Sequence, residues 1–296
     1  MHLKKHLFYI FLGLLALGLF YFYAISSFFH AKQVARYENL TELGQEYEAA
    51  GELEQARKAY PVAREARILT GRELGSRKAL VLTFDGIGER GDLEAIFQLL
   101  QRKGWKATFF VEGINGAHES VLLQQLGRDG QDLENYSFVG LAHGERLDPD
   151  QVLVQLVQTQ KVLKVAAGQP ARVGKLGDTR YTPEICRAAS ASGLEALVQS
   201  DLELKPGDLT NPDKLVLAES RIHPGMVLSL RMDHPVPPAP KKKVPVGTPA
   251  IDKMPTVEDK QEPAAPARSL VQGVEDLCDW LAHQGWDVVP VTVLLP

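Results

Sequence analysis

The sequence predicts an α/β protein in which helices cover a parallel sheet. Two observations lead to this prediction. From about residue 76 onward, short apolar runs typical of buried strands alternate with segments whose apolar residues recur at helical spacing. Three of the helical segments start with a capping residue followed by proline, and glycines lie where two of them should end. Repeated β-α units of this kind imply a parallel sheet, either open or closed into a barrel.

Length, charge and cysteine content exclude several classes of protein. The chain has 296 residues, enough for one sizeable domain with accessory segments. Its formal net charge of −4 argues against nucleic acid as the main partner. The two cysteines, Cys186 and Cys278, are far apart and show no C-x-x-C spacing. A cysteine-ligated zinc site and a disulfide framework are therefore excluded, although one bridge between the two remains open.

Residues 1–30 are expected to anchor the protein in a membrane. Residues 7–29 carry no charge, and as a helix they would span roughly 35 Å, more than a hydrocarbon core of about 30 Å. The alternative is a cleaved signal peptide, because "AIS" at 24–26 resembles a cleavage site, but the apolar run exceeds the usual signal core of about 7–15 residues. The short basic amino terminus favours the cytoplasmic side. The sequence therefore predicts a single-pass membrane protein with its body on the extracytoplasmic side.

Residues 31–75 are expected to form a short helical hairpin. Residues 40–70 read as two helices, and their small and aromatic residues resemble a single tetratricopeptide repeat. Only one copy is visible, although such repeats need neighbours to bury their faces, and Pro61 would kink the second helix. Two interpretations stay open: a hairpin that acts as a stalk or docks on the next domain, or a repeat that binds protein partners.

Residues 76–296 contain the β-α units, starting with the strand "ALVLTF" at 79–84. The helix after it carries Leu93, Ile96, Phe97 and Leu100 on one face. The strand "ATFFV" at 107–111 and a helix near 119–127 follow. Three further helices are expected to begin at Asp148-Pro149, Thr182-Pro183 and Asn211-Pro212, and two of them to end at Gly168 and Gly193. Strands are expected near 195–199, 226–231 and 286–291.

Residues 235–268 interrupt this pattern. They hold nine of the chain's 18 prolines and almost no aromatic or branched-aliphatic clusters. Such a composition cannot bury a core, so a disordered or extended Pro/Lys-rich insertion is expected. The three lysines at 241–243 either keep this loop solvated or contact an anionic polymer.

The order of these segments resembles the NodB-type polysaccharide deacetylases, carbohydrate esterase family four. Members usually read T-F-D-D-G-P, then a helix, then K-A-T-F-F; this chain reads "LTFDGIG" and, about 20 residues on, "KATFF". Its ending, "LVQGVEDLCDWLAHQGWDVVPVTVLL", resembles the family's last helix and strand. The resemblance covers about residues 76–234 and 269–296. It implies a distorted (β/α) barrel, here preceded by a transmembrane helix and the helical hairpin.

The resemblance also implies a metal-dependent reaction that removes acetyl groups from polysaccharides. A divalent metal, commonly zinc, is held by one Asp and two His, polarises the acetyl carbonyl and lowers the pKa of the attacking water. The first Asp of T-F-D-D acts as base and the second binds the metal. A later His, in a leucine-rich strand, acts as acid.

Carried over residue by residue, the metal ligands are missing. Asp85 matches the base, but Gly86 replaces the metal-binding Asp. In "GQDLENYSFVG" at 130–140, Tyr136 and Gly140 stand where the two histidines belong. The positions of the motif arginine in R-P-P-Y-G and of the acid histidine in L-L-H-D are taken by Lys175 and Arg231. We expect Lys175 to contact substrate.

Asp85 itself has two interpretations from the sequence. It either accepts hydrogen bonds from sugar hydroxyls or pairs with Lys175 or Arg231, or else it caps the turn before the helix that starts near residue 92.

Three hypotheses for function follow. The first is a catalytically degenerate, membrane-anchored homologue that needs no cofactor and binds an envelope or exopolysaccharide glycan or assists a synthesis or export complex. The second is an active deacetylase that holds zinc or another divalent metal in a site rebuilt from Asp85, His143 and His234. The third is a scaffold that contacts protein partners through residues 40–70.

Overall fold

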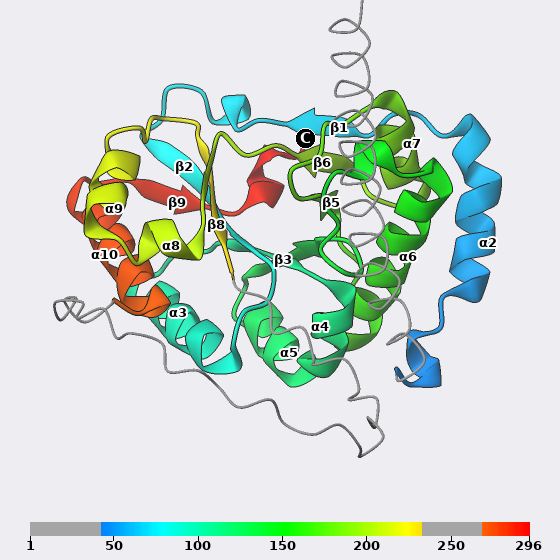
Figure 1. The fold of residues 1–296 in the computed structure, drawn as a ribbon, viewed down its shortest axis with the longest axis horizontal. Helices are drawn as coiled ribbons and strands as arrows, with labels where there is room; N and C mark the ends of the chain where they lie inside the picture. Colours follow the sequence, from blue (N-terminus) through cyan, green and yellow to red (C-terminus); the bar gives the residue numbers. More distant parts are fainter. Residues whose placement is uncertain (1–42, 233–267) are drawn as a thin grey trace, which may run out of the picture. The chain divides into compact units, whose positions relative to one another are not determined.

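The computed structural model describes residues 43–232 and 268–296. From Gly44 onward, these residues form one compact unit in which helices line the outside of a curved, parallel sheet (Figure 1). The strands lie in the order β1-β6-β5-β4-β3-β2-β8-β7, and β9 pairs with β2 outside this path. Their bounds are β1 Arg67–Leu69, β2 Ala79–Asp85, β3 Thr108–Val111, β4 Asp132–Asn135, β5 Val173–Gly174, β6 Ala196–Val198, β7 Leu202–Leu204, β8 Val227–Arg231 and β9 Asp287–Val289.

The central strand β2 shows how the sheet separates core from site. Successive side chains of a strand point to opposite faces, so Ala79, Val81, Thr83 and Asp85 share the inner face. Ala79 and Val81 belong to the apolar cluster inside the curved sheet, whereas Thr83 and Asp85 continue the same row with polar groups. The neighbouring strand β8 changes in the same way, from Val227 to Ser229. The interior is therefore apolar at the amino edge of the sheet and polar at its carboxyl edge.

The helices form where the capping signals predicted them. Helix α6 (Pro149–Ala166) begins after Asp148, whose carboxylate accepts a hydrogen bond from the Asp150 backbone N–H. Helix α7 (Pro183–Ala191) begins after Thr182. Gly168 and Gly193 follow the two helix ends with φ of 87° and 94°, the left-handed region that glycine adopts most readily. These predicted starts and stops are confirmed.

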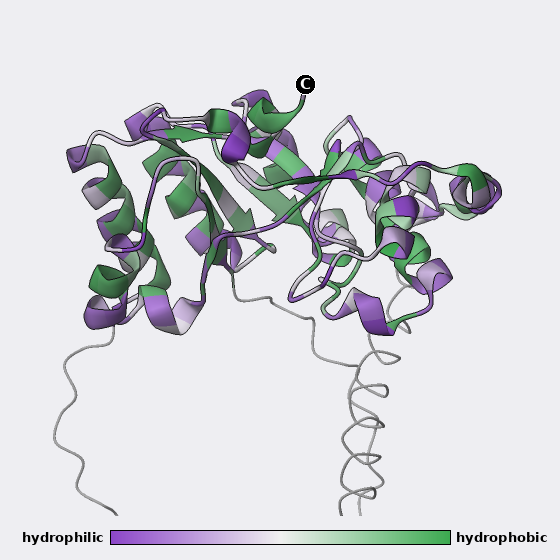
Figure 2. Cartoon of the chain, turned by 90° about the horizontal axis from the view of Figure 1, so that it is seen from above, coloured by the Kyte–Doolittle hydropathy of each residue, from purple (hydrophilic) through white to green (hydrophobic). Residues whose placement is uncertain are grey.

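The other helices surround the same sheet. Figure 2 shows mostly hydrophobic strands and helices whose hydrophobic and hydrophilic residues lie on different sides. Helix α3 carries the predicted buried face of Leu93, Ile96, Phe97 and Leu100. The helix bounds are α2 Ala50–Ala59, α3 Arg90–Lys103, α4 Gly113–His118, α5 Ser120–Arg128, α8 Pro206–Leu209, α9 Pro212–Glu219 and α10 Leu270–His283.

The expected helical hairpin is wrong for the part of it that the structure describes. Helix α2 is followed by a 3₁₀ turn at Tyr60–Val62 and then by strand β1, which pairs in parallel with β6. Pro61 lacks the N–H that a continuing helix needs, and the chain joins the sheet instead. Helix α2 packs beside α6, where Arg57 pairs with Asp150 at 2.6 Å. The compact unit thus begins well before residue 76.

The barrel is less closed than the resemblance implied. β1 and β7 are the two ends of the strand order, and within residues 43–232 and 268–296 no ladder joins them. The result is a parallel half-barrel. The strands β4, β5 and β7 were not predicted, because their sequences, DLEN, VG and LEL, contain no continuous apolar run that marks a buried strand. Cys186 and Cys278 are both free and buried, so no bridge joins them.

Two sequence predictions lie outside the described residues. The apolar segment 7–29 and the insertion at 235–268, apart from its last residue, belong to the parts that the structure does not describe. Among the described residues, no helix has the length and apolar character needed to cross a membrane. The anchor and the insertion therefore stay predictions.

Candidate functional site

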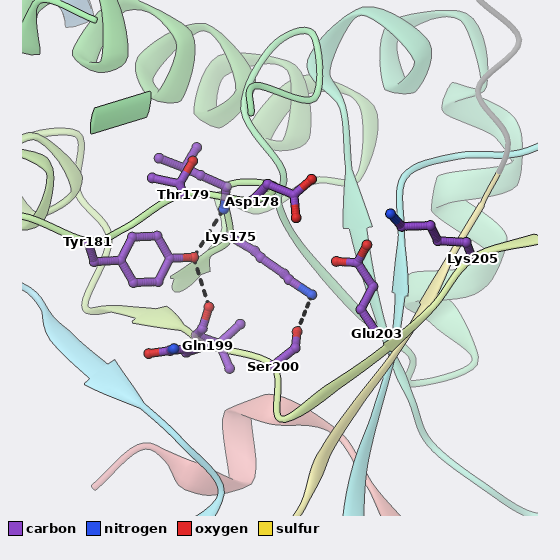
Figure 3. A pocket seen from close by; sticks show the side chains of 10 residues that line it. Lys175, Asp178, Thr179, Tyr181, Gln199, Ser200, Glu203 and Lys205 are labelled. Atoms are coloured by element: carbon purple, nitrogen blue, oxygen red, sulfur yellow. Dashed lines mark hydrogen bonds between the residues drawn. The ribbon is translucent and has the colours of Figure 1, made fainter. Parts of the chain in front are cut away.

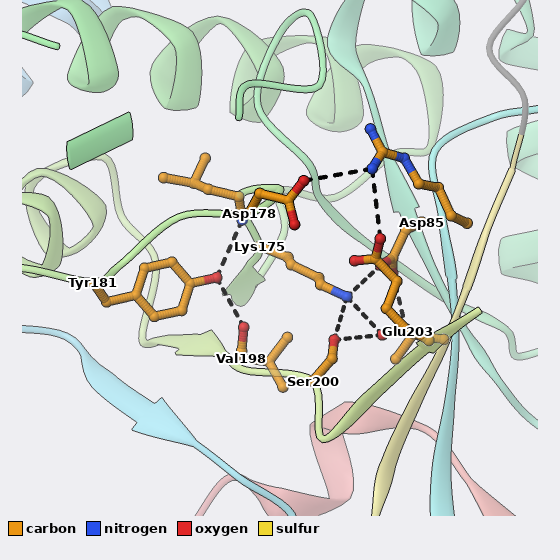
Figure 4. Close-up of polar contacts among 11 residues, drawn as sticks. Asp85, Lys175, Asp178, Tyr181, Val198, Ser200 and Glu203 are labelled. Atoms are coloured by element: carbon orange, nitrogen blue, oxygen red, sulfur yellow. Dashed lines mark hydrogen bonds and ion pairs between the residues drawn. The ribbon is translucent and has the colours of Figure 1, made fainter. Parts of the chain in front are cut away.

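A buried ion pair lies at the carboxyl edge of the sheet. Asp85, the last residue of β2, is completely buried, and its Oδ1 accepts a hydrogen bond from Thr83 Oγ1 at 2.9 Å. Its Oδ2 contacts the ammonium of Lys175, which follows β5 and is only 4% exposed (Figure 4). A buried carboxylate needs a partner of opposite charge or strong donors, and Asp85 has both.

Lys175 uses its ammonium to connect three other side chains. Besides Asp85, its Nζ bonds to Ser200 Oγ at 2.5 Å and to Ser229 Oγ at 2.6 Å. The same nitrogen lies 5.8 Å from the centroid of the Phe110 ring, within the range of a cation–π contact. An ammonium has three donors, and Asp85, Ser200 and Ser229 supply one acceptor for each. All three donors of Lys175 are therefore used.

The hydroxyls form a chain from the strand interior to the surface. Thr83 and Ser229 face each other across β2 and β8, and their oxygens are 2.8 Å apart. Ser229 Oγ is in turn 2.6 Å from Ser200 Oγ. Thr83 and Ser229 are fully buried, whereas Ser200, in the loop between β6 and β7, is partly exposed. We call Thr83, Asp85, Lys175, Ser200 and Ser229 the edge network.

A pocket opens beside this network. It has a volume of about 420 Å³ and lies where β5, β6 and β7 end (Figure 3). Of the edge network, Lys175 and Ser200 line it. Asp178, Glu203 and Lys205 also line it, so acids, bases and a hydroxyl surround one space. Polar side chains that converge in a concave site are typical of ligand pockets.

Arg231 lies opposite Asp85 in the pairing of β2 with β8, but its guanidinium contacts other acids. Its Nη1 is 3.5 Å from Glu203 Oε1 and 3.8 Å from Asp178 Oδ2. Of the two cationic partners that the sequence offered to Asp85, the structure thus places Lys175 on the carboxylate and Arg231 on two pocket acids. Asp85 does not cap the next helix either, because α3 begins after Glu89, without a side-chain cap.

The positions that correspond to the missing metal ligands are occupied in other ways. Gly86 has a φ of 93°, and its N–H donates to the Phe110 carbonyl at 2.8 Å. The next amide, of Ile87, donates to Glu112 Oε2 at 2.7 Å. Backbone and Glu112 therefore fix the turn after Asp85.

Tyr136 and Gly140 offer no better ligands. Tyr136 is 1% exposed, and its burial together with the charge of Asp85 raises the pKa of the phenol well above its ordinary value. Gly140 has a φ of 67°, and a Cβ there would lie 3.3 Å from Glu112 Cγ. A neutral phenol and a crowded, left-handed glycine position do not replace two imidazoles.

The described residues do not fit the family's metal. The one carboxylate that matches the family, Asp85, already holds an ammonium, and a second cation beside Lys175 would be repelled. Within residues 43–232 and 268–296, no cluster of three or more His, Cys, Asp or Glu could hold an ion. His143 lies in a loop, half exposed, with Nδ1 3.9 Å from Glu145 Oε1. His234 lies outside the described residues, so the rebuilt site remains a prediction.

Sequence reasoning missed three members of the edge network. Thr83 and Ser229 carry a weak signal, since each is a polar residue on the inner face of an otherwise apolar strand, in "LVLTFD" and "VLSLR". Ser200 carries none: it is an ordinary loop serine until β5, β6 and β8 are brought together.

Comparisons with known proteins agree with this architecture. Residues 73–197 match the family model described as polysaccharide deacetylase. No curated protein sequence matches the chain significantly.

Solved structures share the fold at low identity. One is a mutant of a CE4 family pseudoenzyme from Bacillus anthracis with restored enzymatic activity, 20% identical with a TM-score of 0.54, over 74% of this chain and 68% of that chain. Another is the peptidoglycan deacetylase PdaC from Bacillus subtilis, 18% identical with a TM-score of 0.53, over 73% and 89%. A third is a family 4 carbohydrate esterase from Streptomyces lividans in complex with acetate, 19% identical with a TM-score of 0.52, over 72% and 93%.

At these identities the structural likeness shows a common fold, and the family itself rests on the sequence match. Residues 73–197 therefore belong to a domain of the polysaccharide deacetylase family.

Proposed function

We propose that this chain is a glycan-binding protein of the cell envelope that does not perform the metal-dependent deacetylation of its family. The observation that carries the proposal is the buried ammonium of Lys175 on the carboxylate of Asp85. A general base must be able to take a proton from its substrate water. Both carboxylate oxygens of Asp85 are already engaged, one by Thr83 and one by Lys175, and the positive charge of Lys175 repels a metal ion.

The pocket beside the pair supports the binding of a polar, uncharged ligand such as a sugar. Two carboxylates, Asp178 and Glu203, can accept hydrogen bonds from hydroxyls, and Lys205 and Ser200 can donate them. The charges of the pocket side chains nearly balance, which disfavours a strongly charged ligand. Amide and hydroxyl groups of an N-acetylated sugar offer both donors and acceptors to this lining.

The structural relatives support the choice of ligand class. One is a peptidoglycan deacetylase, and another is a pseudoenzyme of the same esterase family. The same fold occurs in a peptidoglycan deacetylase and in a pseudoenzyme. This supports a protein that binds glycan without deacetylating it.

The location in the envelope rests on the amino-terminal segment. An uncharged run at 7–29 would hold the domain at a membrane, and Lys4 and Lys5 before it favour a body outside the cytoplasm. Fractionation of cells that express the full chain should place it in the membrane pellet, resistant to salt washing. Protease added to spheroplasts should degrade the body, and protection from protease would contradict this orientation.

Binding and catalysis are tested together on the full chain. We expect chitin oligosaccharides or soluble peptidoglycan fragments to bind in calorimetric titrations, and Glu203→Gln to weaken that binding about tenfold through one lost charged hydrogen bond. Glu195→Gln is the matched control, because Glu195 pairs with Arg172 on the surface, outside the pocket. Acetate release that requires added zinc and stops with a chelator would overturn the proposal.

A further inference from the structure

We propose that the pocket selects glycans without acid groups, and that Asp178 and Glu203 exclude sugars that carry a carboxylate. This inference rests on the proposed function and narrows its ligand from glycans in general to neutral, hydroxyl-rich ones. The arrangement of charge carries it: two carboxylates line the pocket, and the one cation that they share does not line it.

Asp178 and Glu203 share a single guanidinium. Asp178 Oδ2 and Glu203 Oε1 lie 3.8 and 3.5 Å from the same nitrogen, Arg231 Nη1. The two acidic side chains come from different segments and point toward each other (Figure 3). One guanidinium between two carboxylates leaves one negative charge unbalanced. Because the acids line the pocket and Arg231 does not, this charge faces the ligand.

Each of the two acids also has an acceptor to spare. In the part of the chain that the structure describes, Arg231 is the only cation paired with either acid, and Asp178 Oδ1 and Glu203 Oε2 accept no hydrogen bond. An ionised carboxylate accepts hydrogen bonds and donates none. Sugar hydroxyls can therefore donate to these oxygens, whereas a sugar carboxylate cannot.

Lys175 lines the pocket but offers no free donor to a ligand. Its three donors go to Asp85, Ser200 and Ser229. An acidic sugar that took the ammonium for itself would leave the carboxylate of Asp85 buried without its cation, which is strongly unfavourable. The charge of Lys175 is therefore balanced inside the protein and does not attract an acidic ligand.

Lys205 is the remaining cation of the lining. It is exposed, and among residues 43–232 and 268–296 it pairs with neither acid. In sum its charge offsets the unbalanced negative charge, but the two are screened differently. An exposed lysine ammonium is strongly hydrated, whereas the Glu203 side chain is only 21% exposed. Water therefore weakens the attraction by Lys205 more than the repulsion by Glu203.

A neutral chain of N-acetylated hexosamines satisfies this lining. Its hydroxyl and amide N–H groups can donate to Asp178 and Glu203, and its oxygens can accept from Lys205. When a hydroxymethyl group of the same chain is replaced by a carboxylate, a donor is lost and a like charge is brought to the two acids. Like charges placed together cost binding free energy, so the neutral chain is the class that the pocket selects.

Calorimetric titration of the full chain with two matched ligands tests the selection. One ligand is a chitin oligosaccharide, and the other is the same oligosaccharide with its primary hydroxyls oxidised to carboxylates. We expect the neutral ligand to bind about tenfold more tightly. Glu203→Gln should weaken binding of the neutral ligand but strengthen binding of the oxidised one, because it removes the repelling charge.

Asp178→Asn should change the preference in the same direction. Asp178 has a φ of 42°, and asparagine tolerates this left-handed conformation as well as aspartate does, so the loop should keep its shape. Lys205→Gln should have the opposite effect and widen the preference for the neutral ligand, because it removes the cation that attracts acid groups.

Glu195→Gln separates a local effect from an effect of overall charge. It removes the same single negative charge, but Glu195 pairs with Arg172 at the surface and does not line the pocket, so the preference should stay at about tenfold.

Equal or tighter binding of the oxidised ligand by the wild type would overturn the inference and leave glycan binding standing. A preference that Glu195→Gln and Glu203→Gln reduce alike would overturn it as well. Binding of neither ligand would overturn the proposed function together with this inference.

Discussion

Asp85 and Glu134 are both buried carboxylates on one sheet, but their surroundings differ. Asp85 meets a lysine ammonium and a threonine hydroxyl. Glu134, on β4, is 4% exposed, and its Oε2 accepts only backbone N–H groups, from Arg172 at 2.8 Å and Val173 at 2.7 Å. Burial raises the pKa of Glu134 to about 8, despite these hydrogen bonds.

The difference separates a structural acid from a functional one. Glu134 bridges β4 and β5, where the ladder consists of a single pair, Asn135 and Gly174. Its hydrogen bonds replace ladder bonds that the two-residue strand β5 does not make. Asp85 serves no such purpose, because β2 is fully paired with its neighbours. A buried cation, three hydroxyls and a pocket at Asp85 are the features of a site.

The largest expected effect comes from removing the cation at Asp85. Lys175→Met leaves the carboxylate buried without its counter-charge, and such a loss typically costs about 3–5 kcal/mol. Urea denaturation of the full chain should show this as a lower midpoint. The double variant Asp85→Asn with Lys175→Met removes both charges and should recover much of the loss. A single variant as stable as the wild type would show that the pair does not form.

A pH-dependent effect is expected at Glu134. In the folded state its pKa is about 8, above the ordinary value of about 4.3, so the folded protein binds the extra proton. The contribution of Glu134 to the free energy of unfolding is therefore fully present below about pH 4 and is lost as the pH rises toward 8. A difference of one pH unit between the folded and unfolded pKa corresponds to about 1.4 kcal/mol, so the free energy of unfolding should fall by a few kcal/mol across this range.

Glu134→Gln is the matched variant for this pH effect. Its amide oxygen can accept the same two N–H bonds, and it does not titrate. The variant should lose this part of the decline in unfolding free energy with pH, while Glu195→Gln, at the surface, should keep it. An unchanged pH profile in Glu134→Gln would contradict the assignment.

A smaller effect is expected at the turn after Asp85. Gly86 adopts a φ of 93°, and a side chain in a left-handed conformation costs roughly 1–2 kcal/mol. Gly86→Ala should lower the free energy of unfolding by about this amount. Gly91→Ala, in α3, is the control, because a Cβ there meets no atom within 4 Å. Equal stabilities of the two variants would show that the turn tolerates a side chain.

The smallest effect is expected at an exposed carboxylate. Asp150 pairs with Arg57 at 2.6 Å, and about half of each side chain is exposed. Solvent screens such a pair, so Arg57→Ala should shift the urea midpoint by at most about a fifth of the Lys175→Met shift. A comparable shift would mean that docking of α2 on α6 depends on this pair.

The sequence predicted the regular parts of the fold well because their signals are local. Caps at Asp148 and Thr182, the stop at Gly168 and the apolar face of α3 each lie within a few neighbouring residues. Strands β4, β5 and β7 were missed because they contain no continuous apolar run, and β1 because its partner, β6, lies far along the chain.

The site was predictable only in part, because most of its contacts join residues that are far apart in the sequence. The resemblance pointed to Asp85 and Lys175, and their contact was one of several alternatives. Ser200 and Ser229 join the network through the pairing of β2 with β8 and the loop after β6, which a single sequence does not contain. The members of the edge network come together through contacts between strands that are far apart in the sequence, and their residue types alone do not indicate these contacts.

The measurement that tests the central claim most directly is the zinc content of the purified full chain after dialysis against zinc and then buffer. Because a lysine ammonium occupies the carboxylate of Asp85, we predict far less than one bound ion per chain, and no difference between the wild type and Asp85→Asn. One tightly held zinc per chain, lost in Asp85→Asn and in His143→Ala or His234→Ala, would contradict the account and make this protein a metal-dependent deacetylase.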